Sequence, residues 1–317
     1  MSRFTIRLLA LFIAWGVASA QAQEAMFDPG DIGKPGSRVG MGMRSLGPAK
    51  TDEESRSLIV QADGYAYLGD DVTLRQARLT ALAEAKRLAL QSAHTYIDSS
   101  TTVENGMLSS DRIEAKTRGS VRVLEQKDHG LQDGRYHIWI KAEVRYDLTP
   151  PKGQEVKALT SASAPLTVRA WTDQKHYTAG QSVTIHLWGN RDFYARVVDV
   201  MADGSIVQLA PNRYRSETLF KGGVTHTLPD PQQGDRFQLT VSPPFGEDRI
   251  VVYASSNPLG AAATREIGMG LGQYAGDRAS LANVTRGLTL TPTGGAQGST
   301  AGVAEFHEAE WRFTTTP

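Results

Sequence analysis

Apolar residues recur at steps of three and four positions between residues 74 and 89, and charged residues lie off this stripe. The stripe consists of Leu74, Ala77, Ala81, Ala85, Leu88 and Ala89. Such a period is typical of an amphipathic helix. Because most of these residues are alanines, we expect the helix backbone to lie close to a sheet.

Runs that alternate between apolar and polar residues lie on both sides of this helix. LIVQADGYAYLG begins at Leu58 and indicates a strand that is broken or bulged at Gly64. SVRVLEQKD and RYHIWIKAEVRY follow the helix, and Asp133-Gly134 between them is a hairpin signal. In the last run, alternation from Tyr136 to Tyr146 predicts one core face and one largely solvated face. Residues 58–148 are therefore predicted to form a small β-α-β-β domain of the α+β class.

These residues resemble the N-terminal domain of flagellar assembly protein T and small envelope lipoprotein domains. The resemblance rests on Gly64 and Ala66 of the first strand, on the alanines of the helix and on the closing strand from Trp139 to Tyr146. It implies no flagellar partner.

A proline-rich and serine-rich stretch, residues 149–165, predicts a linker between two units. From Leu166 onward, short apolar or alternating runs are separated by turn signals at Ala179-Gly180, Asp203-Gly204 and Pro243-Pro244. No run of useful length has a helical period. Residues 166–317 are therefore predicted to form a mainly antiparallel β-sandwich.

The second unit resembles a bacterial family known as domain of unknown function 4384. The matching features are Tyr177 and Gly180, the segment from Asn190 to Tyr194, the Asp203-Gly204 hairpin, the turn from Leu209 to Asn212, Gly222, Pro229, the segment from Pro243 to Gly246 and the VVYASSNP end. The resemblance implies an accessory β domain without a shared catalytic motif. A glycine-rich insertion near residues 259–303 departs from the family pattern, and AEFHEAEWRFTTT is expected to return to the sheet as a final strand.

The N-terminus has the layout of a secretory signal peptide over residues 1–22. Arg3 and Arg7 precede an apolar run from Leu8 to Val17, which is shorter than the roughly 20 residues needed to span a bilayer. Small residues at 18–22 offer two cleavage sites, and residues 23–57 are expected to form a flexible arm. With no cysteine available for acylation, the sequence predicts a soluble periplasmic or secreted product.

Composition narrows the possible functions further. The chain has 34 basic and 34 acidic residues, which gives no indication of a nucleic-acid partner. The absence of cysteine removes disulfides, thiolate metal sites and thiol nucleophiles. We expect no stable membrane span and no cofactor, and the oligomeric state is left open.

Four residues form the candidate ligand site, namely Asn190, Asp192, Tyr194 and Asn212. They could line a ligand cleft in the second unit. Alternatively, the short polar side chains could bond nearby backbone groups in tight bends. The sequence favours this second interpretation.

Other chemical motifs are incomplete. His176 and His186 could meet across two strands, but two imidazoles are too few for a structural zinc site, and no metal is expected. Glycines 268–276 are interpreted as a flexible loop. Glu308 and Glu310 share one strand face, interpreted as solvated, although paired carboxylates with Glu305 could support glycosidase chemistry.

The sequence thus predicts a non-enzymatic accessory module of the bacterial cell envelope, which binds an envelope protein or a cell-wall component. A hydrolase of an envelope polymer and a binding protein for a small molecule are the alternatives.

Overall fold

The computed structural model describes residues 51–102, 114–149, 159–268, 270–287 and 302–317, so the predicted signal peptide and most of the predicted arm lie outside the described residues. The first half of the described chain contains β1 (Glu53–Tyr67), α1 (Leu74–Thr102), β2 (Glu114–Gln132) and β3 (Arg135–Thr149). The second half contains β4 (Val168–Thr172), β5 (His176–Thr178), β6 (Ser182–Val183), β7 (Ile185–Gly189), β8 (Phe193–Val200), β9 (Ile206–Ala210), β10 (Leu219–Phe220), β11 (Thr225–Leu228), η1 (Pro231–Gln233), β12 (Leu239–Thr240), β13 (Glu247–Ser255), β14 (Thr264–Gly268), β15 (Leu271–Tyr274), α3 (Arg278–Thr285) and β16 (Ala304–Thr316). The predicted fold class, a β-α-β-β unit followed by mainly antiparallel sheets, is confirmed.

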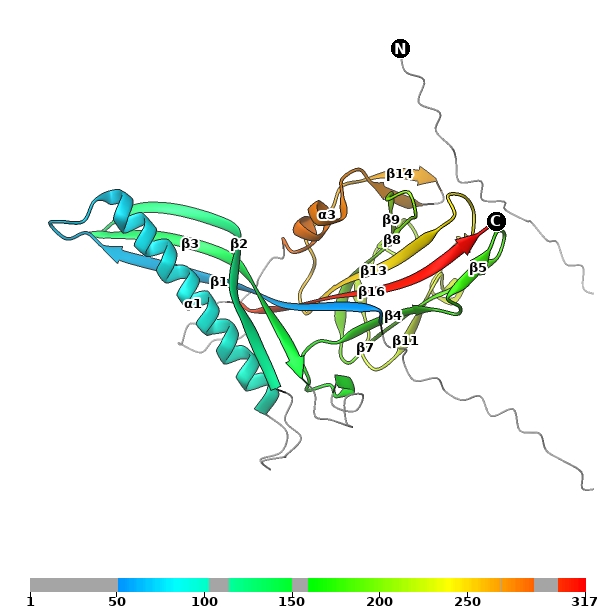
Figure 1. Cartoon of the computed structure of the whole chain (residues 1–317), viewed down its shortest axis with the longest axis horizontal. Helices are drawn as coiled ribbons and strands as arrows, with labels where there is room; N and C mark the ends of the chain where they lie inside the picture. Colours follow the sequence, from blue (N-terminus) through cyan, green and yellow to red (C-terminus); the bar gives the residue numbers. More distant parts are fainter. Residues whose placement is uncertain (1–50, 103–113, 150–158, 269, 288–301) are drawn as a thin grey trace, which may run out of the picture. The chain divides into compact units, whose positions relative to one another are not determined.

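Helix α1 lies across one face of β1, β2 and β3 (Figure 1). Its start is fixed by reciprocal hydrogen bonds, in which Gln76 N donates to Thr73 Oγ1 and Thr73 N donates to Gln76 Oε1. Such a capping box satisfies donors that the first turn leaves free. The alanines at 77, 81, 85 and 89 are fully buried against the sheet, as the periodicity predicted.

Gly64 explains how closely the helix approaches. A Cβ at this position would lie 2.0 Å from the carbonyl oxygen of Ala81 and 2.5 Å from the backbone nitrogen of Ala85. The expectation of a break or bulge at Gly64 is wrong, because β1 pairs with β3 from Arg56 to Tyr67 without a register shift. The glycine makes room for the helix backbone and does not interrupt the strand.

The β2–β3 hairpin turns at Asp133 and Gly134, which have φ values of 48° and 76°. Two successive positive values fit the type I′ turn that the Asp-Gly pair predicted. On β3 the side chains of Ile138, Ile140 and Ala142 are fully buried toward α1, so the predicted core face is confirmed.

The large sheet has the order β14-β15-β9-β8-β13-β16-β1-β3-β2. A second sheet, β11-β7-β4, contributes Val168, Leu187 and other side chains to a core that also contains Val197, Val252 and Ala309 of the large sheet. The two sheets therefore enclose one core, as in a sandwich. β5 pairs with β16 in parallel, whereas the other ladders are antiparallel among the described strands.

β1 connects the two predicted units. It pairs with β16 over Glu53–Ile59 and with β3 over Arg56–Tyr67, so one sheet runs through both units. The strand begins at Glu53, and the prediction that the flexible arm extends to residue 57 is wrong at this end. Residues 48–317 form one compact unit, and the remaining sequence-based boundaries stay predictions.

The region from 259 to 287 contains more structure than its glycines suggested. β14 and β15 form a hairpin that continues the large sheet next to β9, so the interpretation of residues 268–276 as a flexible glycine loop is wrong. Helix α3 follows, and the Asp277 side chain accepts a hydrogen bond from Ser280 N at its start. Within the described segments, no helix is both long and apolar enough to cross a membrane.

Candidate functional site

The four residues of the candidate ligand site point to different surroundings. Asn190 is buried, and its side chain accepts from Thr167 N at 2.9 Å and donates to the carbonyl oxygens of Ser161 and Ala164 at 2.8 and 3.1 Å. It thereby holds the segment that enters β4. Its polar atoms are occupied by backbone partners.

Asp192, Tyr194 and Asn212 do not join Asn190 around one cavity. Asp192 is exposed, and it accepts from Lys221 Nζ at 2.7 Å and from Gly222 N at 2.9 Å. Asn212 accepts from Tyr214 N and donates to Leu209 O within its own turn. Tyr194 lies on β8 opposite Leu219. The bonds of Asn212 are those that the turn interpretation describes, whereas Asn190 and Asp192 bond residues that are distant in sequence.

The carboxylates of β16 are the feature that the sequence interpretation placed wrongly. Glu310 is only 1% exposed at its side chain and Glu308 is 15% exposed, so their shared face is not solvated. Helix α3 covers this face. Arg278 contacts both carboxylates, at 2.8 Å for Glu308 and 2.5 Å for Glu310, and Arg286 at the end of α3 bonds Glu308 at 3.0 Å.

Arg286 also links this cluster to the first half of the unit. Its Nε donates to Glu143 of β3 at 2.8 Å, and both side chains are at least 95% buried. Burial alone would raise the pKa of Glu310, but the hydrogen bonds and charges of Arg312 and Arg278 lower it. Both carboxylates that were considered for glycosidase chemistry are therefore held in ion pairs with arginine.

The opposite face of β16 carries Glu305 and His307, which are also buried. Glu305 accepts from the Tyr96 hydroxyl at 2.8 Å, pairs with Arg191 and accepts from Leu166 N. His307 accepts at Nδ1 from Val168 N at 3.0 Å. Burial lowers the pKa of His307 to about 4, so the ring is neutral near pH 7.

The histidine pair considered from sequence has other partners. His186 lies 2.6 Å from Asp173 and stacks on Trp171, whereas His176 is exposed on β5. Over the ranges described, no group of three histidine, aspartate or glutamate side chains is arranged to hold a metal ion.

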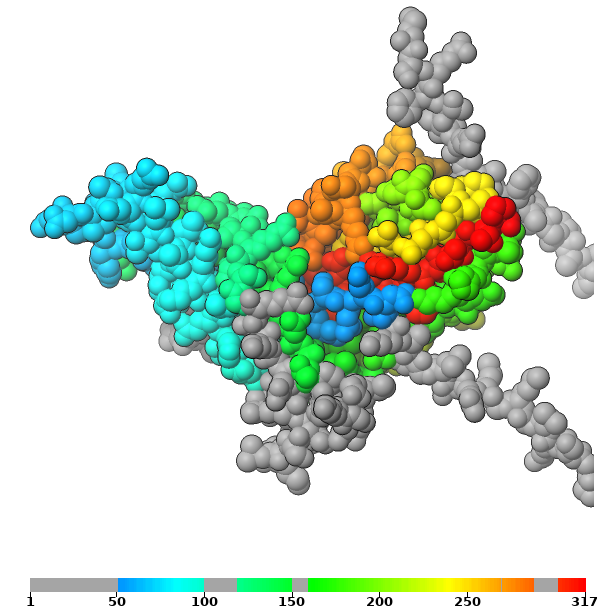
Figure 2. Space-filling view, in the orientation of Figure 1, coloured from blue at the N-terminus to red at the C-terminus, as the bar shows by residue number. Residues whose placement is uncertain are grey.

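The largest group of exposed apolar side chains lies where β1 ends and α1 begins. We call it the tip surface, and it consists of Tyr67, Leu68, Val72, Leu74, Leu79 and Leu131. Six of the eleven exposed large hydrophobic residues in the described structure lie there, with Tyr67, Leu79 and Leu74 exposed by 75%, 58% and 55%. Leu68 N bonds Gly134 O, which joins the β1 end to the β2–β3 turn. Figure 2 shows this blue-to-cyan segment at the surface.

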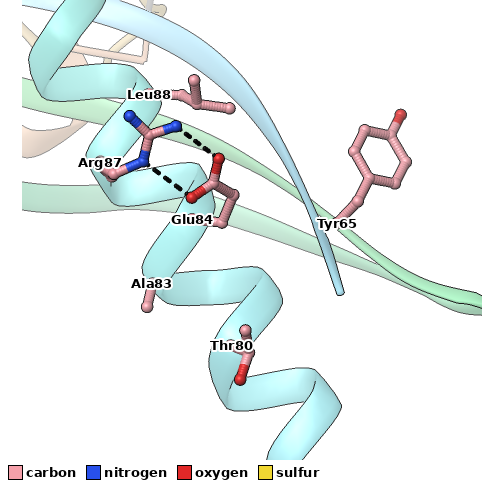
Figure 3. A pocket seen from close by; sticks show the side chains of 6 residues that line it. All are labelled: Tyr65, Thr80, Ala83, Glu84, Arg87 and Leu88. Carbon is pink, nitrogen blue, oxygen red and sulfur yellow. Dashed lines mark hydrogen bonds and ion pairs between the residues drawn. The ribbon is translucent and has the colours of Figure 1, made fainter. Parts of the chain in front are cut away.

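Next to the tip surface, an open pocket of about 360 Å³ lies between β1 and α1. It is lined by Tyr65 of β1 and by Thr80, Ala83, Glu84, Arg87 and Leu88 of α1 (Figure 3). Arg87 donates to both oxygens of Glu84, at 2.9 and 2.7 Å, so the charged groups of the pocket form one neutral pair. The pocket is thus open, partly apolar and overall uncharged.

The sequence patterns predicted neither the tip surface nor the pocket. The helical period predicted which side of α1 packs on the sheet. Leu79 lies outside that stripe as a large apolar residue on the exposed side, and this was the signal that could have indicated the tip surface.

Comparison with known proteins identifies part of the second half. Residues 176–258 match the family described as "Domain of unknown function (DUF4384)". The match covers β5 to β13 and stops before the β14–β15 hairpin. Neither the curated proteins nor the solved structures gave a match. The matched segment does not include the tip surface or the pocket.

Proposed function

We propose that this chain is an exported, non-enzymatic accessory module that binds a protein partner in the bacterial cell envelope. The observation that carries the proposal is the tip surface. Exposed apolar side chains scattered singly are ordinary, whereas a contiguous group marks an interaction site. Here five of them lie within residues 67–79, on the β1 end, the following loop and the first turns of α1, and Leu131 lies near the end of β2, in the hairpin that the Leu68 N–Gly134 O bond joins to the β1 end.

The chemistry of the tip surface favours a protein over a cell-wall polymer. Its members are leucines and a valine with a single tyrosine. Aliphatic side chains gain from contact with apolar groups and offer no hydrogen bonds to sugar hydroxyls. The charges beside them are of both signs, with exposed Asp70, Asp71 and Asp133 near Arg75. An apolar centre with a polar rim is the usual composition of a protein–protein interface.

The test is recovery of partners from an envelope extract with two matched aliphatic-to-aspartate variants. Leu79→Asp places a charge in the tip surface, and Ile267→Asp places one on an exposed leucine-sized side chain of β14. We expect wild type and Ile267→Asp to recover the same protein, and Leu79→Asp to lose it. Failure of wild type to recover any specific protein, or equal recovery by both variants, would contradict the proposal.

Export is the second part of the proposal, and it is supported by the leader-like composition of residues 1–22. Expression of the full chain followed by cell fractionation and N-terminal sequencing tests it. The expected product begins after Ala20 or Ala22 and is recovered outside the cytoplasm. An intact N-terminus on a cytoplasmic product would refute export without affecting the tip surface.

A further inference from the structure

The outer half of β1 is an open sheet edge. β16 pairs with one edge of β1 only as far as Ile59, whereas β3 pairs with the other edge as far as Tyr67. Within the described segments, residues 60–67 therefore have a neighbouring strand on one side only. In an edge strand, alternate residues direct their N–H and C=O groups away from the sheet, where another strand can pair with them.

This edge has few of the features that usually protect an edge. The sequence VQADGYAY contains no lysine, no proline and one charged residue, Asp63, which lies 2.6 Å from His137 of β3, and its register with β3 is continuous. β2, the edge strand on the far side of β3, is different. Its ladder has three register shifts, and it carries several charged side chains, among them Arg122, Glu125 and Lys127. Bulges and charges discourage strand addition, so β2 is better protected than the open edge of β1.

Helix α1, beside the open edge, carries charges that could pair with those of the same helix in a second copy. The pocket-lining residues of α1 run from Thr80 to Leu88 and include the oppositely charged Glu84 and Arg87. Gly64, in the middle of the open edge, packs directly under Ala81 and Ala85. A two-fold axis that passes beside Gly64 therefore also passes beside this part of α1. Antiparallel pairing about that axis brings Glu84 of one copy opposite Arg87 of the other.

We infer that the open edge of β1, together with the exposed side of α1 around Ala83, takes a second copy of this chain in a symmetric dimer. The two β1 strands pair antiparallel and the two helices lie side by side on one face of the joined sheet. A two-fold interface uses the same patch twice, so it needs a patch that complements itself. The opposite charges of Glu84 and Arg87 meet this requirement, and the open edge includes Tyr67 of the tip surface.

Charge variants test the inference by oligomeric state. Glu84→Arg leaves only positive charges at the seam, and Arg87→Glu leaves only negative charges. We expect each to weaken the dimer by about tenfold or more, since lost attraction and new repulsion occur twice across the axis. An equimolar mixture of the two variants should form a heterodimer of wild-type affinity. Sedimentation equilibrium measures all four samples, and thermal unfolding confirms that each variant is folded.

Cross-linking locates the interface, and the absence of native cysteines removes the background. Ala83→Cys should be joined into a dimer by a short bismaleimide. His94→Cys is the control, because it lies three turns further along the same side of α1. With the axis midway between Glu84 and Arg87 and a rise of 1.5 Å per residue, the two control positions are about 26 Å apart along the helices, against about 8 Å for the two Ala83 positions. A monomeric wild type, a mixture no tighter than the single variants, or equal cross-linking at both positions would overturn the inference.

Discussion

Gly64→Ala provides a stringent test of how α1 is held against the sheet. The added methyl group would lie 2.0 Å from Ala81 O and 2.5 Å from Ala85 N, and both atoms belong to the helix backbone. Ordinary van der Waals contacts of a Cβ atom with another heavy atom begin near 3.4 Å. Because backbone atoms cannot rotate away, the whole helix must move outward by about 1 Å, which opens gaps along the buried alanines.

The expected cost follows from two opposing effects. Overpacking a well-filled core destabilises by about 1–3 kcal/mol, and a clash with backbone belongs at the upper end of that range. Replacing glycine by alanine also restricts the unfolded chain, which stabilises by about 0.4–1 kcal/mol. The net loss is therefore about 2 kcal/mol. For a unit of this size it corresponds to a fall in Tm of roughly 4–8 °C.

Thermal unfolding followed by circular dichroism measures this effect, with Gly69→Ala as the matched control. At Gly69 the nearest atom to an added Cβ is Val72 Cγ2 at 3.8 Å, so no clash arises. The control should melt at the wild-type temperature or slightly above it. If Gly64→Ala melts with the control, the close contact between Gly64 and α1 does not hold the helix.

Three further experiments test the buried titratable groups. Arg286→Met leaves Glu143 buried without its nearest partner and should cost about 3–5 kcal/mol in urea denaturation, part of which Glu143→Gln restores. Burial holds the pKa of His307 at about 4 against 6.5, so only the unfolded chain takes up the proton as the pH falls from 6.5 to 4. Stability then declines over that window, and His307→Asn should remove this part of the decline in urea midpoints. Burial raises the pKa of Asp199 to about 8 from 3.8, so the folded chain keeps a proton that the unfolded chain releases. Stability then declines as the pH rises from 4 to 8, and Asp199→Asn should gain stability relative to wild type over that range.

Local patterns predicted those parts of the fold that depend on neighbours in sequence. The alanine spacing of α1, the Asp133-Gly134 turn and the core face of β3 each reflect geometry within one or two elements. α3 escaped prediction because it has only eight residues and lies in a glycine-rich region. Without α3, the face of Glu308 and Glu310 had no covering element, and solvent was the simplest assumption.

The candidate sites show the same limit. Side-chain bonds within a turn, such as those of Asn212, follow from the residue types and their spacing. Ion pairs such as Arg286 with Glu143 join residues 143 positions apart. Charge alone could not identify such partners among 34 basic and 34 acidic residues.

β1 shows why an open edge in particular cannot be recognised from hydrophobic pattern. Leu58, Ile59 and Val60 form a continuous apolar run and are buried on both faces, whereas Gln61 to Tyr67 alternate and are buried on one face. Pattern therefore reports how many faces of a strand are covered. Neighbouring strands are joined through backbone N–H and C=O groups, and every residue except proline carries both groups. The change from two neighbouring strands to one after Ile59 consequently leaves no mark in the residue types, and it becomes visible only when β16 is placed.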